Sequence, residues 1–194
     1  MAFPGENEFR AERKAVLATM EGLTDDEFES APTLCDGWAP RDVGAHLMGI
    51  DNELLAYVRA YGNLHKAHAD IIARTRELDR AAFMARFRTW SESPALIART
   101  ASWGLLGDLC IHHQDILRGL HRNRAMPIAA RDAILREGTF LGAKKLFTYR
   151  VEPNDGGRAI GRSSGTNHTV RGTSEVLGLW LTGRKGLEPE LTFS

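Results

Sequence analysis

The chain has 194 residues, of which 43% are hydrophobic and 26% are charged, a composition typical of a soluble globular protein with one domain, or one domain and a small appendage. Lys and Arg balance Asp and Glu at 25 each, which excludes the basic surface of a nucleic-acid-binding protein and also an acidic tail. No apolar run approaches the ~20 residues of a membrane helix, and the N-terminus "MAFPGENEFRAERKAV" is too charged for a secretory signal, so we expect a cytoplasmic protein.

Helical periodicity begins near the N-terminus. Residues 6–22 carry apolar side chains at helical spacing and predict a first helix. Thr24 and Glu27 have the spacing of a capping box, which predicts a further helical turn. The stretch "APTLCDGWAP" is a loop by its Pro and Gly content, and Pro40 fits the first position of the next helix. An apolar stripe extends that helix to about residue 62.

More helices are expected in the middle of the chain. The charged, amphipathic stretch 66–90 predicts one or two of them. Ser93 and Pro94 are interpreted as the N-cap and the first residue of another helix, which ends near residue 120. Residues 127–144 predict one more, opened by a proline.

The character of the chain changes after residue 145. Short segments rich in β-branched and aromatic residues predict strands at "LFTYRVEP", "GRAIGR", "HTVRG" and "PELTFS". Before the last of these, "TSEVLGLWLTGR" predicts a helix capped by Thr173 or Ser174. We therefore expect a mainly α protein in two parts: a domain with at least four substantial helices over residues 1–145, and a small α+β domain over residues 146–194.

A group of polar residues interrupts the apolar helical faces. Asp108 and His112 stand four residues apart, so they lie on one face of their helix, one turn apart. His46 lies on the apolar face of the helix that begins at Pro40, and antiparallel packing of the two helices would bring it opposite Asp108 and His112. Two imidazoles and a carboxylate form a sensible site for a divalent metal that also binds water. The alternative is that each histidine is a hydrogen-bonded core residue.

Other residues near these positions have simpler interpretations. His113 lies about 100° around the helix from His112, which places it outside the cluster. Cys35 and Cys110 are interpreted as small buried hydrophobic residues, since two cysteines are too few for a disulfide framework. Asp115 either accepts a hydrogen bond from a ligand histidine or pairs at the surface with the arginine three residues after it.

Three stretches resemble one known family, in the same order, along nearly the whole chain. They are "TLCDGWAPRDVGAHL", "DLCIHHQDILRG" and "TSEVLGLWLTGR", and the family is the mycothiol-dependent maleylpyruvate isomerase family, within the broader DinB/YfiT-like metal-binding superfamily. The first stretch resembles a C-x-G-W-x-x-x-D-x-x-x-H-L segment whose histidine falls at His46. The second resembles an E-x-x-x-H-x-x-D segment that falls on Asp108, His112 and Asp115. The third resembles the helix of the family's C-terminal module and ends at Arg184.

The resemblance implies both a fold and an activity. The fold is a DinB-like four-helix bundle followed by a small α+β domain. The activity is that of a metal-dependent enzyme, with zinc the expected metal, which uses mycothiol or a similar low-molecular-weight thiol. Such an enzyme transfers the thiol to a small electrophilic substrate, or uses it to isomerise one. The implied metal ligands are His46, Asp108 and His112, and metal coordination would deprotonate the thiol, so that no protein cysteine is needed.

One position departs from the family's pattern, and one residue has two interpretations. Asp108 stands where the family has Glu, and its side chain is shorter by one methylene. Either the helices approach more closely, or the carboxylate binds through water, or the site has lost its metal; Asp is itself a competent zinc ligand, so we keep the metal. Arg184 is either a catalytic residue that binds a carboxylate of substrate or cofactor across the domain interface, or a residue that favours the helix dipole.

Two alternative functions use the same bundle with a lost or altered metal site. One is a non-catalytic small-molecule binding protein, which Asp108 favours, and the other is a thiol-independent biosynthetic enzyme. The metal content of the purified protein and the thiol dependence of its activity distinguish them. The expected partners are a small-molecule thiol and a small electrophilic substrate, without nucleic acid or membrane, and the sequence identifies neither the substrate nor the oligomeric state.

Overall fold

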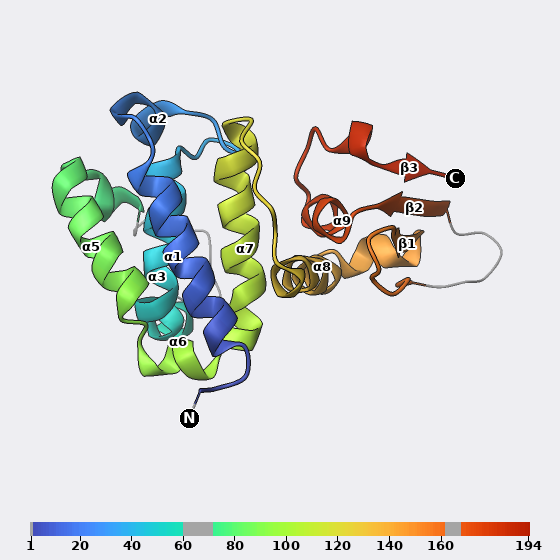
Figure 1. Cartoon of the computed structure of the whole chain (residues 1–194), viewed down its shortest axis with the longest axis horizontal. Helices are drawn as coiled ribbons and strands as arrows, with labels where there is room; N and C mark the ends of the chain where they lie inside the picture. Colours follow the sequence, from blue (N-terminus) through green and yellow to red (C-terminus); the bar gives the residue numbers. More distant parts are fainter. Residues whose placement is uncertain (1, 60–71, 162–167) are drawn as a thin grey trace. The chain divides into compact units, whose positions relative to one another are not determined.

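The computed structural model describes residues 2–59, 72–161 and 168–194, and shows a mainly helical chain that ends in a small sheet (Figure 1). The fold class predicted from the sequence is confirmed, because every described strand follows residue 145. Among the described residues, no helix has the length and hydropathy that a membrane crossing requires. The elements in chain order are α1 (Glu6–Glu21), α2 (Asp25–Ser30), α3 (Pro40–Arg59), α5 (Arg80–Glu92), α6 (Leu96–Thr100), α7 (Ser102–Gly119), α8 (Ile128–Leu141), a 3-10 helix (Ala143–Phe147), β1 (Tyr149–Pro153), β2 (His168–Gly172), α9 (Ser174–Leu181), a 3-10 helix (Glu188–Glu190) and β3 (Thr192–Phe193).

These elements fall into two compact units. The first comprises Met1–Leu105 and His112–Asn123, and the second comprises Leu106–Ile111 and Arg124–Ser194. The continuous helix α7 therefore contributes residues to both units. Helix α8 is grouped with the sheet in the second unit. The domain boundary expected from the sequence lies after α8, at residue 145, and it stays a prediction.

The core of the first unit lies among α1, α3, α5 and α7. Gly44 of α3 permits close packing there, because a Cβ at this position would lie 2.9 Å from Met20 Cε and 3.1 Å from Phe83 Cζ. Each large apolar side chain that is fully buried contributes about 1.5–3 kcal/mol to folding. The fully buried apolar residues of these helices include Phe9, Val16, Met20, Val43, Leu47, Phe83, Phe87 and Ile116. The helical bundle expected for this part of the chain is therefore present.

Most of the predicted helix starts are found in the structure. Helix α2 has the predicted capping box: Thr24 Oγ1 accepts from Glu27 N–H at 3.2 Å, and Glu27 Oε2 accepts from Thr24 N–H at 2.9 Å. Helix α3 begins at Pro40, as predicted, and its expected end near residue 62 lies outside the described residues. Helix α5 and the helical residues 72–76 confirm the helices expected within 66–90, of which residues 66–71 are likewise outside the described part.

The single helix predicted from Pro94 to about residue 120 is wrong. Ser93 is the C-cap of α5, and its N–H donates to Thr89 O at 3.0 Å. The next residues form two helices, α6 and α7, which meet at Ala101. A physical reason for the break lies in Ser102, whose hydroxyl donates to main-chain oxygens of α6, at 3.0 Å and 2.8 Å. A serine side chain that bonds the preceding turn competes with the regular helix ladder.

The second unit combines the sheet with α8 and α9. Strand β1 is parallel to β2, and β2 is antiparallel to β3, while the predicted strand "GRAIGR" forms only an isolated bridge between Val151 and Ile160. Thr173 caps α9 as predicted, accepting from Val176 N–H at 3.3 Å. Helices α8 and α9 touch backbone to backbone, since a Cβ at Gly178 would lie 2.5 Å from the main-chain oxygen of Ile134.

Glu6, at the start of α1, predicts how the first unit responds to acid. Its carboxylate accepts from Phe3 N–H at 3.0 Å, Arg10 Nε at 2.9 Å and Arg99 Nε at 2.7 Å. The hydrogen bond from Arg99, more than any other contact, lowers the pKa of Glu6 from 4.5 to about 2. Because the folded pKa lies below the unfolded value, the stabilisation is complete above about pH 4.5 and is lost as the pH falls towards 2.

We therefore expect Glu6→Gln to flatten the loss of stability between pH 5 and pH 2. Urea unfolding at a series of pH values measures this slope. Glu8→Gln is the matched control, because Glu8 lies in the same helical turn with an exposed side chain. A Glu6→Gln protein that loses stability in acid as steeply as the parent would contradict the assignment.

Candidate metal centre

The loop between α2 and α3 is built against helix α7. Leu34 N–H donates to the main-chain oxygen of Asp115 at 3.1 Å. Gly119 permits this approach, because a Cβ there would overlap the main-chain oxygen of Pro32. Within the loop, Thr33 Oγ1 donates to the main-chain oxygen of Trp38 at 2.9 Å. The loop therefore reaches the start of α3 in a conformation that α7 determines.

His46 and His112 lie together beside this loop. His46 lies on α3, and His112 lies on α7. Both histidines are buried, with 4% and 7% of their surface exposed. Their ring centroids are 4.6 Å apart in an edge-to-face arrangement. Trp38 covers both rings, at centroid distances of 5.5 Å from His46 and 6.1 Å from His112.

Asp108 joins the two histidines, as expected from the sequence. One ligand atom of each of His46, Asp108 and His112 lies within 4.8 Å of the other two. Asp108 is half-buried. Two imidazole nitrogens and a carboxylate oxygen suit zinc and similar divalent metals, with positions left for water or another ligand. The chemistry of the donor set therefore fits a metal, and the role of these three residues as ligands stays a prediction.

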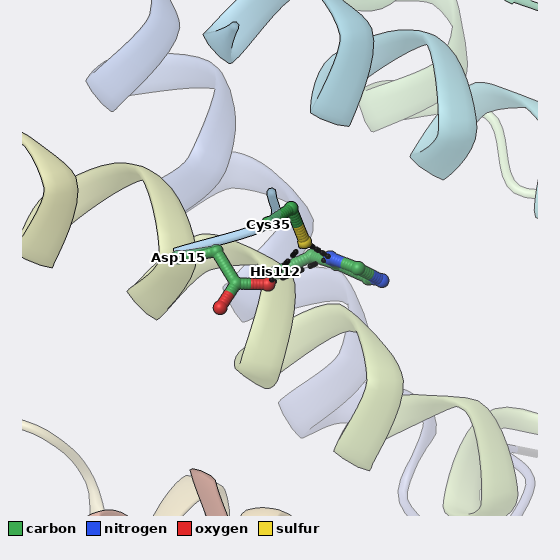
Figure 2. A group of neighbouring side chains, drawn as sticks. All are labelled: Cys35, His112 and Asp115. Atoms are coloured by element: carbon green, nitrogen blue, oxygen red, sulfur yellow. Dashed lines mark hydrogen bonds and ion pairs between the residues drawn. The ribbon is translucent and has the colours of Figure 1, made fainter. Parts of the chain in front are cut away.

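Sequence reasoning missed one member of this neighbourhood, Cys35. It was expected to be a small buried hydrophobic residue, but it is half-exposed and its thiol donates to Asp115 Oδ2 at 3.0 Å (Figure 2). The same Oδ2 lies 2.9 Å from His112 Nδ1. Asp115 therefore contacts the histidine that one of its two predicted interpretations names, and the hydrogen bond to a ligand histidine stays a prediction. Cys35, His112 and Asp115 also form a second group with ligand atoms within 4.8 Å of one another.

His113 faces the opposite way, as the helical geometry predicted. Its Nδ1 lies 2.7 Å from Glu12 Oε1, and its Nε2 lies 2.8 Å from Thr19 Oγ1, so both ring nitrogens contact α1. The ring is 1% exposed. His113 therefore joins α7 to α1 and belongs to neither group of candidate metal ligands.

A second carboxylate, Glu137 of α8, stands near Asp108 and was also missed. Gly107 lets α8 come close, because a Cβ at Gly107 would lie 2.6 Å from Glu137 Cβ. Burial, and then the negative charge of Asp108, raise the pKa of Glu137. The sequence placed Glu137 in a helix without indicating which face it occupies relative to Asp108.

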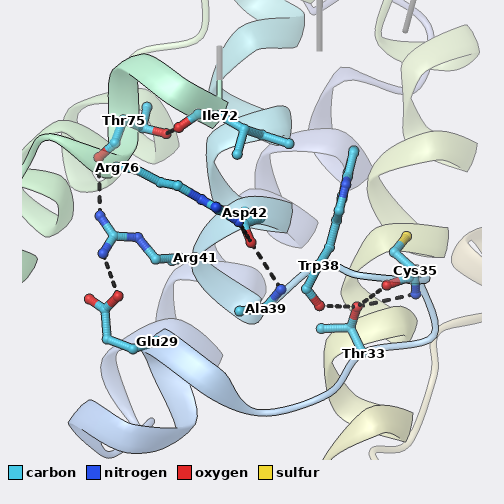
Figure 3. Close-up of polar contacts among 10 residues, drawn as sticks. All are labelled: Glu29, Thr33, Cys35, Trp38, Ala39, Arg41, Asp42, Ile72, Thr75 and Arg76. Atoms are coloured by element: carbon cyan, nitrogen blue, oxygen red, sulfur yellow. Dashed lines mark hydrogen bonds and ion pairs between the residues drawn. The ribbon is translucent and has the colours of Figure 1, made fainter. Parts of the chain in front are cut away.

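A cavity of about 420 Å³ lies beside Trp38 in the first unit. Figure 3 draws several of its lining residues, among them Cys35, Asp42 and Arg76, with their polar contacts. Cys35 and Trp38 line the cavity, and these two residues also contact His112, although none of His46, Asp108 and His112 is a lining residue. Arg76 forms another part of its wall and donates two hydrogen bonds to Asp42, at 3.0 Å and 2.9 Å. These bonds raise the pKa of the Arg76 guanidinium. The cavity gives a small molecule room next to the candidate metal centre.

Arg184 follows α9 in the second unit. It is half-buried, and its N–H donates to the main-chain oxygen of Leu179 at 3.1 Å. Gly183 before it has a φ of +93°, the left-handed conformation that commonly ends a helix. A position after a helix C-terminus agrees with the interpretation based on the helix dipole, and a catalytic role for Arg184 stays a prediction.

Comparisons with known proteins identify similar domains and structures. A family model described as "Mycothiol maleylpyruvate isomerase N-terminal domain" matches residues 9–63. A crystal structure of the mycothiol-dependent maleylpyruvate isomerase superposes with a TM-score of 0.64 at 12% identity, covering 98% of this chain and 92% of that one. A variant of that enzyme with one histidine replaced by alanine gives a TM-score of 0.62, with the same identity and coverage. At this identity the likeness shows the fold, which is DinB-like. No curated protein sequence matches the chain.

Proposed function

Because residues 9–63 match the family model of the mycothiol maleylpyruvate isomerase N-terminal domain, we propose that the protein is a metal-dependent enzyme of this family that uses mycothiol or a similar low-molecular-weight thiol. The substrate is a small electrophile, to which the thiol is transferred or which the thiol isomerises. The observation that carries the proposal is the convergence of His46, Asp108 and His112, the positions at which the family's motifs have metal ligands.

In this proposal His46, Asp108 and His112 hold a divalent metal, with zinc the first candidate. A bound metal of this kind deprotonates a coordinated thiol and so supplies the thiolate nucleophile at neutral pH. His112 Nδ1 lies 2.9 Å from Asp115 Oδ2, and in this proposal that contact leaves Nε2 as the nitrogen that can ligate. Arg184 remains the candidate to bind a substrate or cofactor carboxylate.

The surroundings of the histidines support chemistry on a reactive thiolate. His46 and His112 are buried, and the indole of Trp38 packs against both rings. An apolar wall of this kind excludes water, which strengthens electrostatic interactions and protects reactive intermediates. The cavity lined by Trp38 and Cys35 is the place where we propose that the small substrate enters.

The non-catalytic alternative is favoured by one observation, the shorter Asp108 in place of the family's Glu. In that case the bundle binds a small molecule without turnover. The two functions differ in metal content and in thiol dependence, so one set of measurements distinguishes them.

The test is a metal analysis combined with a thiol-dependent assay. After loading with zinc and dialysis, we expect about one zinc ion per chain, as in other catalytic zinc sites with three protein ligands. With mycothiol and a panel of small electrophiles that includes maleylpyruvate, product should form only when both metal and thiol are present. Absence of bound zinc after loading would remove the proposed mechanism, and turnover without thiol would favour the thiol-independent enzyme.

A further inference from the structure

The carboxylate of Asp115 holds two side chains at once. Its Oδ2 lies 3.0 Å from Cys35 Sγ and 2.9 Å from His112 Nδ1 (Figure 2). Because an ionised carboxylate only accepts hydrogen bonds, the thiol S–H donates to Oδ2. His112 Nδ1 faces the same oxygen at ion-pair distance and lies 3.6 Å from Cys35 Sγ. Asp115 is 0% exposed, and a buried carboxylate needs such donors to offset the loss of its hydration.

The loop that carries Cys35 is bound to the same aspartate a second time. Leu34 N–H donates to the main-chain oxygen of Asp115 at 3.1 Å. Thr33 Oγ1 accepts from Cys35 N–H, also at 3.1 Å, which fixes the backbone of the cysteine itself. The main-chain oxygen of Cys35 accepts from Trp38 N–H at 3.0 Å, so main-chain contacts before and after the side chain position the thiol over Asp115.

We infer that Cys35 is a positioning residue of the candidate metal centre. Its thiol holds Asp115 Oδ2 in place 2.9 Å from His112 Nδ1, and so it favours one tautomer and one orientation of the ring. The role rests on the proposed function in one respect, namely that His112 is a metal ligand. It goes beyond that function, because Cys35 itself neither binds the metal nor supplies the nucleophile.

The Cys35 thiol restricts the rotation of the Asp115 carboxylate through its hydrogen bond. Without Cys35 S–H, Oδ2 loses a hydrogen-bond donor, and the Asp115 carboxylate gains rotational freedom. The His112 ring then loses a rigid acceptor and populates more orientations and the other tautomer. Partners of this kind, one contact removed from a metal, typically change metal affinity 10–100-fold when they are mutated.

Metal affinity gives the first test. We expect Cys35→Ala to weaken binding of Zn²⁺ or Co²⁺ by about tenfold, and Cys35→Ser to restore most of the affinity, because a hydroxyl also donates to Asp115. Cys110→Ala is the matched control, since Cys110 is the chain's other cysteine, also lies near His112 on α7, and belongs to neither group of candidate ligands. Unchanged affinity in Cys35→Ala would overturn the inference. So would an intense thiolate-to-cobalt absorption band that Cys35→Ala abolishes, because Cys35 would then be a direct ligand.

A second test needs no metal. In ¹⁵N-histidine-labelled metal-free protein, NMR should show His112 with the proton on Nδ1, and Cys35→Ala should raise the population of the other tautomer. In an Asp115→Asn background, Cys35→Ala should have no further effect, since the thiol acts through that carboxylate. Independent effects of the two substitutions would overturn the inference. If the parent protein takes up no metal, the proposed function fails, while the tautomer of His112 still decides the role of Cys35.

Discussion

Asp108→Ala is expected to lower the affinity of the protein for zinc by at least about a hundredfold, more than the loss of a partner outside the ligand set, and to remove the thiol-dependent activity with it. The substitution deletes one of the three side chains whose ligand atoms converge, and the only anionic one. A divalent metal held by two neutral imidazoles alone loses both a bond and most of the compensating charge.

Asp108→Glu should preserve or raise the affinity, because it restores the residue type of the family at this position. Asp108 is half-buried. The extra methylene of a glutamate can therefore lie towards solvent, while the carboxylate still points to the histidines. Zinc titration and thermal unfolding of both variants measure the two effects. Asp132→Ala is a matched control, because Asp132 is an exposed aspartate in a helix and belongs to neither group of candidate ligands.

The opposite pattern is expected of a metal-free polar core. There Asp108→Glu would force an extra methylene against its neighbours at a cost of about 1–3 kcal/mol, while Asp108→Ala would leave only a small cavity. Full zinc binding by Asp108→Ala would remove Asp108 from the ligand set. The order of the two variants in zinc affinity and in stability thus decides between a metal ligand and a packing residue.

Gly178→Ala is expected to destabilise the second unit by about 3 kcal/mol, at the upper end of the effect of overpacking. A Cβ at Gly178 would lie 2.5 Å from the main-chain oxygen of Ile134 and 2.7 Å from its carbonyl carbon. Because these are backbone atoms of α8, no rotamer change relieves the overlap, and α8 and α9 must separate. The gain in helix propensity from Gly to Ala, about 1 kcal/mol, is too small to compensate.

Gly104→Ala is the control for this prediction. Gly104 lies in α7 with nothing within 4 Å of a Cβ placed on it. The same substitution there should stabilise the protein by about 0.5–1 kcal/mol, because alanine loses less backbone entropy on folding. Urea unfolding, with hydrogen exchange of the α8 and α9 amides to locate the effect, measures both variants. A Gly178→Ala protein as stable as the parent would show that the two helices do not need their backbone contact.

Local sequence signals predicted the parts of the fold that depend on local physics. The capping box at Thr24 and the cap at Thr173 satisfy backbone N–H groups within a few residues. The proline at the start of α3 lacks the N–H that would have no helical partner there. Helical spacing also placed Asp108 and His112 on one face, and His46 on the buried face of α3. The N-cap predicted at Ser93 was wrong, because a serine before a proline fits both the end of one helix and the start of another. Here Ser93 ends α5.

The missing parts of the site depend on contacts between distant segments. Cys35 and Asp115 are 80 positions apart, and they meet because the loop before α3 packs on α7 where Gly119 leaves room. Glu137 comes near Asp108 for a similar reason, at Gly107. Neither glycine interrupts the helical pattern of α7, so the sequence alone does not reveal that it marks a close approach.

Because His112 and His113 are consecutive on α7, the rotation of this helix about its axis determines where both rings point. Each ring directs its Nδ1 to a buried carboxylate, Glu12 for His113 and Asp115 for His112, and the two rings project about 100° apart around the same axis. Turning α7 about its axis would break the contact between His113 and Glu12, and it would carry His112 and Asp115 round together, because both lie on α7. Helix α1 supplies none of the candidate ligands, yet through Glu12 it sets the angle at which α7 presents His112, so a change on α1 reaches the candidate metal centre without touching it.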